Sequence, residues 1–359
     1  MPHSRVTFIA VCLANILASS QANALSSTQV YGLVDLSIYS QQLSGQTRVA
    51  AIANGNMTTS FIGVRGGEDL GDGLKASFAF EGFFRADTGE SGRGNTDTFF
   101  QRQSWVGVSD DRLGTLRLGR LPTPNWLTTI KFGPFGGASV TPFVMHTYLP
   151  SALQPMMTGS GASDASWANS IGYISPRWSG FTGMAVYALS EGSANGKRLG
   201  ASLGYDAGPL AASIAFEKLS QMSLPFGAPV APLITAARPS FAATDDSTVQ
   251  AAISYDFTLL KLFGQLAQTK LQNAGSSEIK LVTSQFGVSA PVGAGKVMVS
   301  WAHTKKQQTA TDDLRRDTLS VGYDYNLSKH TDIYAVYLND KVTNLNRGNG
   351  LAVGLRHTF

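Results

Sequence analysis

The sequence is short of cysteine, of charge and of long apolar runs. It has one cysteine in 359 residues, Cys12, near the start of the chain. The rest therefore holds neither a disulfide framework nor a cysteine metal site. Charged residues make up 14%, against roughly 25% in a typical soluble chain. Beyond the first two dozen residues no run approaches the ~18 apolar residues of a spanning helix.

The first 24 residues have the three parts of a secretory signal peptide. Arg5 precedes an apolar stretch from Val6 to Ala18, and Ala22-Asn23-Ala24 has the small residues of a cleavage site. A buried N-terminal helix is the alternative. Removal of residues 1–24 leaves 27 basic residues (28 minus Arg5) against 24 acidic ones. This weak positive balance is not that of a nucleic-acid-binding protein.

What is present is alternation with a period of two residues. In VYGLVDLSI, Val30, Val34 and Ile38 fall on one side and Asp35 and Ser37 on the other. The chain also ends inside such a pattern, GLAVGLRHTF, with no polar tail. Period-two alternation predicts strands with one apolar face. A soluble sandwich and a membrane barrel both satisfy it.

The connections favour the barrel. Sixteen candidate strands begin near residues 29, 58, 74, 99, 114, 167, 181, 197, 209, 248, 260, 281, 294, 315, 331 and 350. Short links such as 67–73 and 206–209 alternate with longer ones at 40–57, 86–98, 121–165 and 219–247. Short turns at one rim and long loops at the other are typical of outer-membrane barrels. We therefore predict an all-β, 16-stranded antiparallel transmembrane barrel over residues 25–359.

Aromatic residues cluster where these strands approach short turns. They are Tyr205, Tyr255, Phe257, Tyr323 and Tyr325, all at positions predicted to face outward. Girdles of aromatic side chains form at bilayer interfaces. The β-propensity of aromatic residues is the simpler alternative for any one of them.

Six ordered motifs then resemble a known family. They are STQVYGLVDLSI, GVRGGEDLGDGLKASFAFE, FFQRQSWVGVSDDRLGTLRLGRLPTP, NSIGYISPRWSGF, GYDYNLSKHTDIYAVY and GLRHTF. In this order they resemble the trimeric general porins of Gram-negative outer membranes, of the neisserial and burkholderial type. The resemblance spans about residues 28–359.

The resemblance implies a homotrimer in the outer membrane, in contact with lipid and lipopolysaccharide. Each barrel would be a water-filled pore for passive diffusion of small anionic or neutral solutes, with no cofactor. The third long loop, about residues 121–166, would fold inward as a constriction. Phe359 would be the signal read by the outer-membrane assembly machinery.

Charged residues of the pore can be assigned in part. Family members commonly carry several acids on the constriction loop, whereas here Lys131 and Asp164 are its only formal charges. Where the family has an arginine in the second strand, this chain has Phe61. Arg102 and Arg120 match family arginines. The pore candidates are Arg65, Arg102, Arg120, Arg117, Lys75, Lys131, Glu81 and Phe61.

Alternation places Arg65 and Arg117 inside and leaves the direction of Arg120 open, because the strand can bulge near Gly119. A few unpaired arginines in a narrow lumen favour anions. We therefore expect weak anion selectivity. The alternative is that each arginine pairs with a carboxylate in the wall.

Other functions are less well supported. The aromatic and methionine residues of 121–166 suggest a channel specific for aromatic or other organic carboxylates, unless these side chains pack the loop against the wall. His146, His303, His330 and His357 lie far apart and show no metal-ligand spacing. No nucleophile and base can be assembled for a barrel-embedded hydrolase. A secreted β-sheet binding module is the remaining alternative. We predict no enzyme activity and no metal site.

Overall fold

A computed structural model describes residues 27–95, 97–149, 165–190, 196–226, 241–273, 278–308 and 311–359. The predicted signal peptide, Asp164 and the end of the predicted constriction loop lie outside these ranges.

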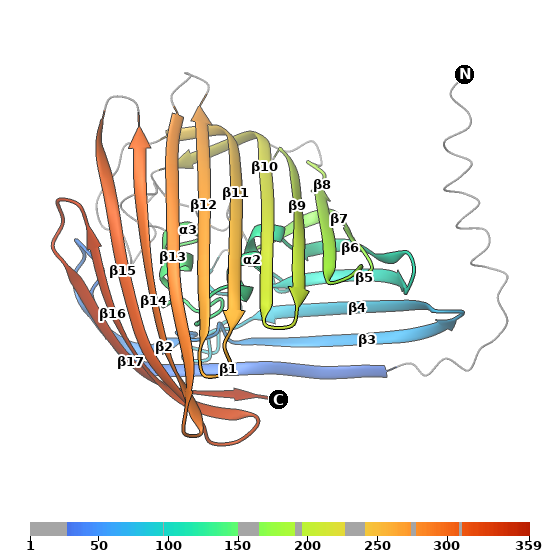
Figure 1. Cartoon of the computed structure of the whole chain (residues 1–359), viewed down its shortest axis with the longest axis horizontal. Helices are drawn as coiled ribbons and strands as arrows, with labels where there is room; N and C mark the ends of the chain where they lie inside the picture. The colour runs from blue at the N-terminus through green and yellow to red at the C-terminus, as the bar shows by residue number, and fades with distance from the viewer. Residues whose placement is uncertain are drawn as a thin grey trace.

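The described chain is one antiparallel sheet with two short helices (Figure 1). The first strands are β1 (Ser27–Gln41), β2 (Val49–Asn54), β3 (Phe61–Gly71), β4 (Leu74–Phe83), β5 (Gln103–Asp110), β6 (Gly114–Pro122), β7 (Ser166–Ile174), β8 (Phe181–Ala188) and β9 (Lys197–Ala207). The others are β10 (Leu210–Phe226), β11 (Phe241–Asp256), β12 (Lys261–Asn273), β13 (Glu278–Val292), β14 (Gly295–Gln308), β15 (Thr311–Asn326), β16 (Thr331–Val342) and β17 (Gly348–Thr358). The helices are α2 (Pro124–Lys131) and α3 (Pro142–Thr147).

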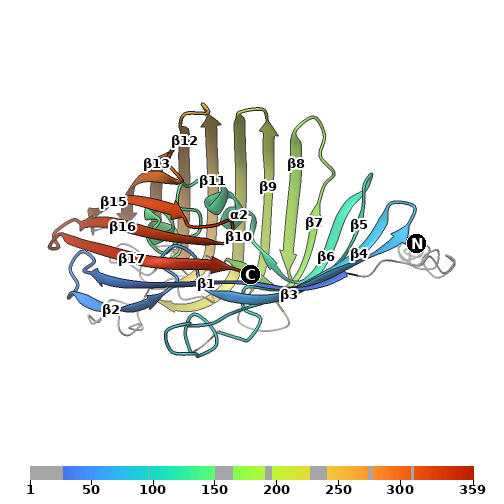
Figure 2. The same cartoon turned by 90° about the horizontal axis from the view of Figure 1, so that it is seen from below.

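The sheet closes on itself. From β3 onward each strand pairs with the next, and β17 pairs with β1, beside which it lies in Figure 2. β2 and β3 pair with successive parts of β1, residues 36–41 and 27–33. β2 and β3 are therefore two halves of one strand, interrupted by residues 55–60. Counting them as one reduces the seventeen strands to sixteen positions around the barrel. The predicted 16-stranded antiparallel barrel is confirmed.

The apolar residues of the strands face outward and the polar ones face inward, as the alternation predicted. Outward residues such as Ile38 and Leu351 are 73% and 54% exposed, whereas the inward Asp35 is fully buried. An exposed apolar band is unfavourable in water and stable in lipid, where only closed sheets and helices satisfy every backbone group. The outward face is therefore suited to a membrane.

Tight turns lie at one end of the strands. Gly208 and Gly293 have φ of +56° and +59° in two-residue links, a region that glycine enters without strain. Outward aromatic pairs lie next to these turns, with ring centroids of Tyr255 and Phe257 4.5 Å apart. The expected positions of the girdle residues match this rim.

Three of the expected long links are shorter or more ordered than predicted. Link 219–247 is wrong over most of its length, because β10 extends to Phe226 and β11 begins at Phe241. The ladder continues because backbone pairing does not depend on the apolar alternation that was used to end the strands. Link 40–57 contains β2, and link 121–165 contains both helices.

The two helices lie on the inner face of the barrel. α2 contacts β8 to β11, and α3 contacts β13 to β15 (Figure 1). Their polar partners are side chains of the buried, inward set, such as Gln250 and Thr304. Within the described ranges, no helix is both long and apolar enough to cross a membrane.

Candidate functional site

Arg65 is held against an aromatic ring on the inner wall. Its guanidinium carbon lies 4.5 Å from the centroid of the Tyr31 ring, and its Nη2 donates to Gln29 Oε1 at 2.9 Å. Both partners come from β1, which pairs with β3 at this level. Arg65 is exposed, and within the described part of the chain it has no carboxylate at ion-pair distance.

Arg102 is held by a carboxylate and a second ring. Its Nη1 pairs with Glu81 Oε2, and its guanidinium carbon lies 4.1 Å from the centroid of Phe61. Glu81 Oε1 also accepts from the Tyr31 hydroxyl and, at 2.6 Å, from Gln103 Nε2. Glu81 is 3% exposed and the Arg102 side chain 36%. The positive partner therefore faces the interior, while the negative partner is covered.

Arg117 forms a third stack. Its guanidinium carbon lies 4.0 Å from the centroid of Trp105, on the neighbouring strand β5.

Arg120 behaves differently, because Gly119 has a φ of +133° and the β6–β7 register shifts between Gly119 and Leu121. Arg120 Nε donates to the carbonyl of Gln101, just before β5. The predicted bulge is present, and Arg120 is bonded to the residue that precedes Arg102.

Acids and bases of the inner face differ in exposure. Six inward acids are each at most 3% exposed, namely Asp35, Glu81, Glu217, Asp246, Asp324 and Asp340. Among the inward bases, Arg65 is exposed and the side chains of Lys131 and Lys296 are 45% and 49% exposed. Asp206 is an exposed acid, and it pairs with Lys131. Asp256, of the same parity as the inward Ser254, is a second exposed acid. Among the residues named here, most acids are covered and most bases are exposed.

α2 is fastened to the wall at both ends. The backbone N–H of Asn125 donates to Glu217 Oε1 at 2.7 Å, so an acid of β10 lies at the N-terminal end of the helix. At the other end, the carbonyls of Thr129 and Phe132 accept from Gln265 Nε2 (3.2 Å) and Gln285 Nε2 (3.3 Å). These wall side chains satisfy the backbone groups that a short helix leaves open.

α3 is fastened by a different set of strands. His146 Nδ1 and Nε2 lie 2.8 and 2.7 Å from the hydroxyls of Thr304 and Thr318. Arg316 Nη1 donates to the carbonyl of Met145 at 2.9 Å. Burial, then the positive charge of Arg316 and that of His303, hold the pKa of His146 well below its usual value. Burial and these two charges therefore disfavour protonation of His146 on the wall.

The apolar residues of the segment 123–149 pack against the barrel. Phe132, Phe135, Phe143 and Met145 are each at most 4% exposed. These four side chains do not line the lumen, whereas Trp126 and Tyr148 are partly exposed, with ring centroids 5.0 Å apart. Phe132, Phe135, Phe143 and Met145 instead pack the segment against the wall, which was the alternative interpretation.

The other predicted residues lie elsewhere. Lys75 is opposite Asp69 next to the β3–β4 turn, six positions along β4 from Glu81. Phe359 is 47% exposed, and its backbone N–H and carbonyl exchange hydrogen bonds with Gly32 of β1 at 3.1 and 3.0 Å. Its role in assembly stays a prediction. In the described ranges, no group of three or more metal-ligating side chains is arranged around a common point.

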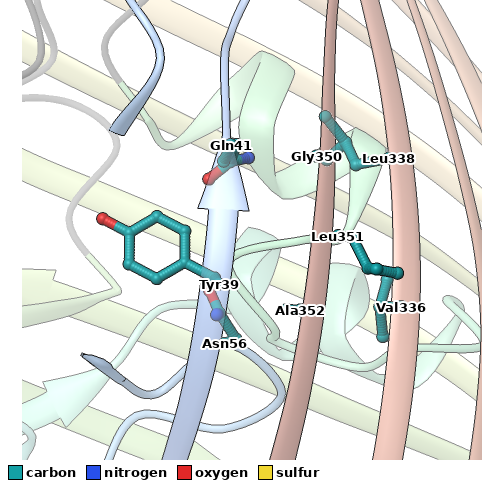
Figure 3. A pocket seen from close by; sticks show the side chains of 8 residues that line it. All are labelled: Tyr39, Gln41, Asn56, Val336, Leu338, Gly350, Leu351 and Ala352. Carbon is teal, nitrogen blue, oxygen red and sulfur yellow. The ribbon is translucent and has the colours of Figure 1, made fainter. Parts of the chain in front are cut away.

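A small pocket lies at the closing seam of the barrel (Figure 3). It is lined by Tyr39 and Gln41 of β1, Asn56, Val336 and Leu338 of β16, and Gly350, Leu351 and Ala352 of β17. Its volume of about 10 Å³ accommodates about one water molecule. It is a packing gap and not a solute site.

Sequence reasoning missed several residues that build the inner face. Tyr31 joins Arg65, Phe61 and Glu81, and its ring lies edge-on to Phe61 at 5.9 Å. Its inward direction was readable, since Tyr31 alternates with Val30. Glu217 was readable in the same way, but its partner Asn125 lies 92 residues away, and no local pattern indicates that contact.

Comparisons with known proteins agree with this architecture. The family model described as Gram-negative porin matches residues 9–345. Outer membrane porin protein 32 of Delftia acidovorans is 32% identical, over 97% of this chain and 99% of the relative. An outer membrane porin protein of Bordetella pertussis is 26% identical over 98% of both chains.

Solved structures are similar as well. An anion-selective porin from Comamonas acidovorans superposes with a TM-score of 0.74 at 28% identity, covering 93% of this chain and 100% of the other. OmpT of Vibrio cholerae in its trimer form gives a TM-score of 0.66 over 93% of this chain and 99% of that one. At 14% identity, the latter shows the fold alone.

Proposed function

This chain belongs to the Gram-negative porin family and is an outer-membrane channel, and we propose that the channel favours small anions over cations. The family and the fold indicate a channel rather than an enzyme. We propose further that it has no catalytic activity.

The observation that carries the anion preference is the unequal exposure of the two charge signs on the inner wall. Arg65 and Arg117 have no carboxylate at ion-pair distance in the described ranges, and Glu81 is covered by its three donors. Fixed positive charge between low-dielectric walls raises the local concentration of anions. The anion selectivity of the Comamonas acidovorans porin supports the same conclusion.

The test is the reversal potential of the purified protein in a planar bilayer under a KCl gradient. The wild type should prefer chloride, and Arg65→Gln/Arg117→Gln should lose most of that preference at similar conductance. Arg315→Gln is the matched control, because Arg315 is exposed on the outward side of β15. Cation preference of the wild type, or an equal effect of the control, would contradict the proposal.

A second candidate function is a channel that favours organic carboxylates. It is supported by the three Arg–aromatic stacks, of which Arg65 and Arg117 have no carboxylate at ion-pair distance in the described ranges. Block of the chloride current by submillimolar benzoate would favour it, whereas an effect equal to that of acetate would not.

We also propose that segment 123–149 is the main part of the constriction loop, about residues 121–166. Its two helices contact β8–β11 and β13–β15, whereas Arg65, Arg102 and Arg117 lie on or next to β3, β5 and β6. Arg120 and Lys75 would add to the field from positions nearer the ends of their strands. Lys131 would contribute less, because Asp206 neutralises it.

The remaining proposals concern assembly and surroundings. Residues 1–24 would be cleaved on export. The chain would form homotrimers in contact with outer-membrane lipid and lipopolysaccharide, as the trimer form of OmpT suggests for the assembly. Phe359 would be recognised by the outer-membrane assembly machinery.

A further inference from the structure

His146 is the centre of a buried hydrogen-bond network that joins α3 to three wall strands. Thr304 of β14 and Thr318 of β15 bind its two ring nitrogens, and Asp340 of β16 accepts from the Thr318 hydroxyl at 2.6 Å. His146 is 1% exposed, and Thr304, Thr318 and Asp340 are each at most 1% exposed. Water cannot replace any of these contacts while α3 stays on the wall.

The hydrogen bonds fix the proton on one ring nitrogen. The Thr318 hydroxyl donates to Asp340, so it can only accept from His146, and Nε2 must carry the proton. In the neutral ring Nδ1 accepts from the Thr304 hydroxyl, whose oxygen lies 2.7 Å from that of Thr283. A second proton on Nδ1 requires the Thr304 hydroxyl to turn and donate to Thr283 instead. The charged ring would then lie in a site closed to water, with a hydroxyl and not a carboxylate at each ring nitrogen. The site therefore disfavours the charged ring.

The surrounding charges do not compensate for an imidazolium. β13 presents Thr283 and Gln285, which do not titrate, and β14 presents Lys306 beyond Thr304, with His303 on its outward side. β15 contributes Arg316. Asp340 is the nearby acid, and it is already engaged by Arg316 Nε (2.8 Å), Arg316 Nη2 (3.3 Å), Thr318 and the backbone of Ser44 (3.0 Å).

The rest of the α3 attachment has few polar contacts. Beside His146, it includes the Arg316 bond to the Met145 carbonyl, the Ser320 bond to the Val140 carbonyl (2.6 Å), the Ser139 hydroxyl bonds to the carbonyls of Gly55 and Asn56 (both 3.3 Å) and apolar packing. α3 itself has six residues, too few to be stable as a free helix. Loss of one buried anchor can therefore undock this end of the segment, while α2 stays fastened through Glu217, Gln265 and Gln285.

We propose that His146 is the positioning residue that holds the α3 end of segment 123–149 on the wall, and that its protonation releases this end into the lumen. This holds whichever ion the channel favours. The docked state needs neutral His146, whereas the released state titrates near the ordinary value of about 6.5. Docking is therefore complete above pH 6.5 and weakens as the pH falls. The ratio of docked to released chains should drop about tenfold per pH unit.

The experiment uses a single cysteine as a reporter. Val144 lies on α3 and is 3% exposed, and Val144→Cys is close to isosteric. Cys12 is the only native cysteine and lies in the segment expected to be removed, so the parent protein measures the background. In detergent-solubilised or reconstituted protein, 4,4′-dithiodipyridine, which reacts with thiols in acid, should label V144C slowly at pH 7.5. At pH 4.5 labelling should be tens of times faster.

Two variants decide which group titrates. V144C/H146Q carries a neutral amide that can still donate toward Thr318, and its labelling should stay slow in acid. V144C/H303Q should respond to acid as V144C does. Comparison at equal pH cancels the pH dependence of the thiol itself. No acid response in V144C, or a response that survives in H146Q and disappears in H303Q, would overturn the proposal.

Fast labelling of V144C/H146Q already at pH 7.5 would show that glutamine does not replace the contacts of His146 and that α3 is released at every pH. The pH dependence of V144C labelling then tests the proposal. A one-proton midpoint below 6.5 that H303Q leaves unchanged supports the proposal, and a midpoint above 6.5 contradicts it. None of these outcomes depends on ion selectivity, so the two proposals fail separately.

Discussion

A single carboxylate shows how the inner wall keeps its positive character. Glu81 faces the interior by alternation and was expected to be an acid of the pore. Instead, Tyr31 and Gln103 donate to one of its oxygens and Arg102 binds the other. Charge-assisted hydrogen bonds stabilise the Glu81 carboxylate, and the side chains that make them also cover it from ions in the lumen. Glu81 therefore positions Arg102 rather than attracting cations.

Removal of one donor should be measurable. Tyr31→Phe leaves the ring that supports Arg65 and deletes the hydroxyl that donates to Glu81 Oε1. We expect the free energy of unfolding to fall by about 1–3 kcal/mol, the usual effect of leaving a buried polar group short of a partner. Urea titration followed by tryptophan fluorescence measures it.

Tyr39→Phe is the matched control for this measurement. Tyr39 is another inward tyrosine of β1, whose hydroxyl makes no hydrogen bond within the described ranges. Its replacement should change stability by less than about 0.5 kcal/mol. Equal losses in the two variants would show that the Glu81 contact contributes nothing.

At the residue scale, alternation predicts the direction of a side chain but not its contacts. Alternation alone placed Arg65, Arg117 and Glu81 on the inner face. It could not place Arg102, whose parity matches that of the outward Val106. β5 begins only at Gln103, so Arg102 is free of the alternation and turns inward to Glu81. Contacts across strands depend on register and on strand ends, which a single sequence does not fix.

At the scale of elements, the terminal strand closes the sheet. The ring of Phe359 covers Gly32, where an added Cβ would lie 2.6 Å from that ring. Phe359→Ala removes this contact at the seam between β1 and β17. We expect a smaller folded fraction, measured as the heat-modifiable band of unheated samples on SDS gels.

Leu355→Ala controls for the loss of outward apolar surface. Leu355 lies on the same face of β17 and is 48% exposed, close to the 47% of Phe359. It should reduce the folded fraction less. Equal reduction by both substitutions would mean that general apolar surface matters and that the terminal position has no special role.

Strands were easier to predict than helices for a physical reason. A strand of a closed barrel has lipid on one side and a polar interior on the other, so each one carries its own period-two pattern. α2 and α3 have eight and six residues and depend on the wall for stability. One signal for α2 was present: Thr123 caps the helix by accepting from Trp126 N–H, and Pro124 follows at the first helical position.

At the scale of the whole molecule, the fold separates charge by depth. Six inward acids are at most 3% exposed, whereas Arg65, Arg102 and Arg117, on or next to β3, β5 and β6, are exposed or partly exposed. The formal charge of the chain is only +4, so the anion preference cannot come from net charge. It must come from which charges the lumen exposes.

A selectivity of this origin should depend on ionic strength. The Debye length falls from about 10 Å at 0.1 M salt to about 3 Å at 1 M, so mobile ions increasingly screen fixed charges. We expect the chloride-to-potassium permeability ratio to be largest in dilute KCl and to approach the ratio of bulk mobilities near 1 M. Reversal potentials measured at a fixed tenfold gradient and increasing mean concentration give this ratio. The chloride-to-potassium permeability ratio of R65Q/R117Q should be low in dilute KCl and should change little as the concentration rises. A wild-type ratio that stays constant across this range would indicate short-range anion sites, and would contradict selectivity by the field of the wall.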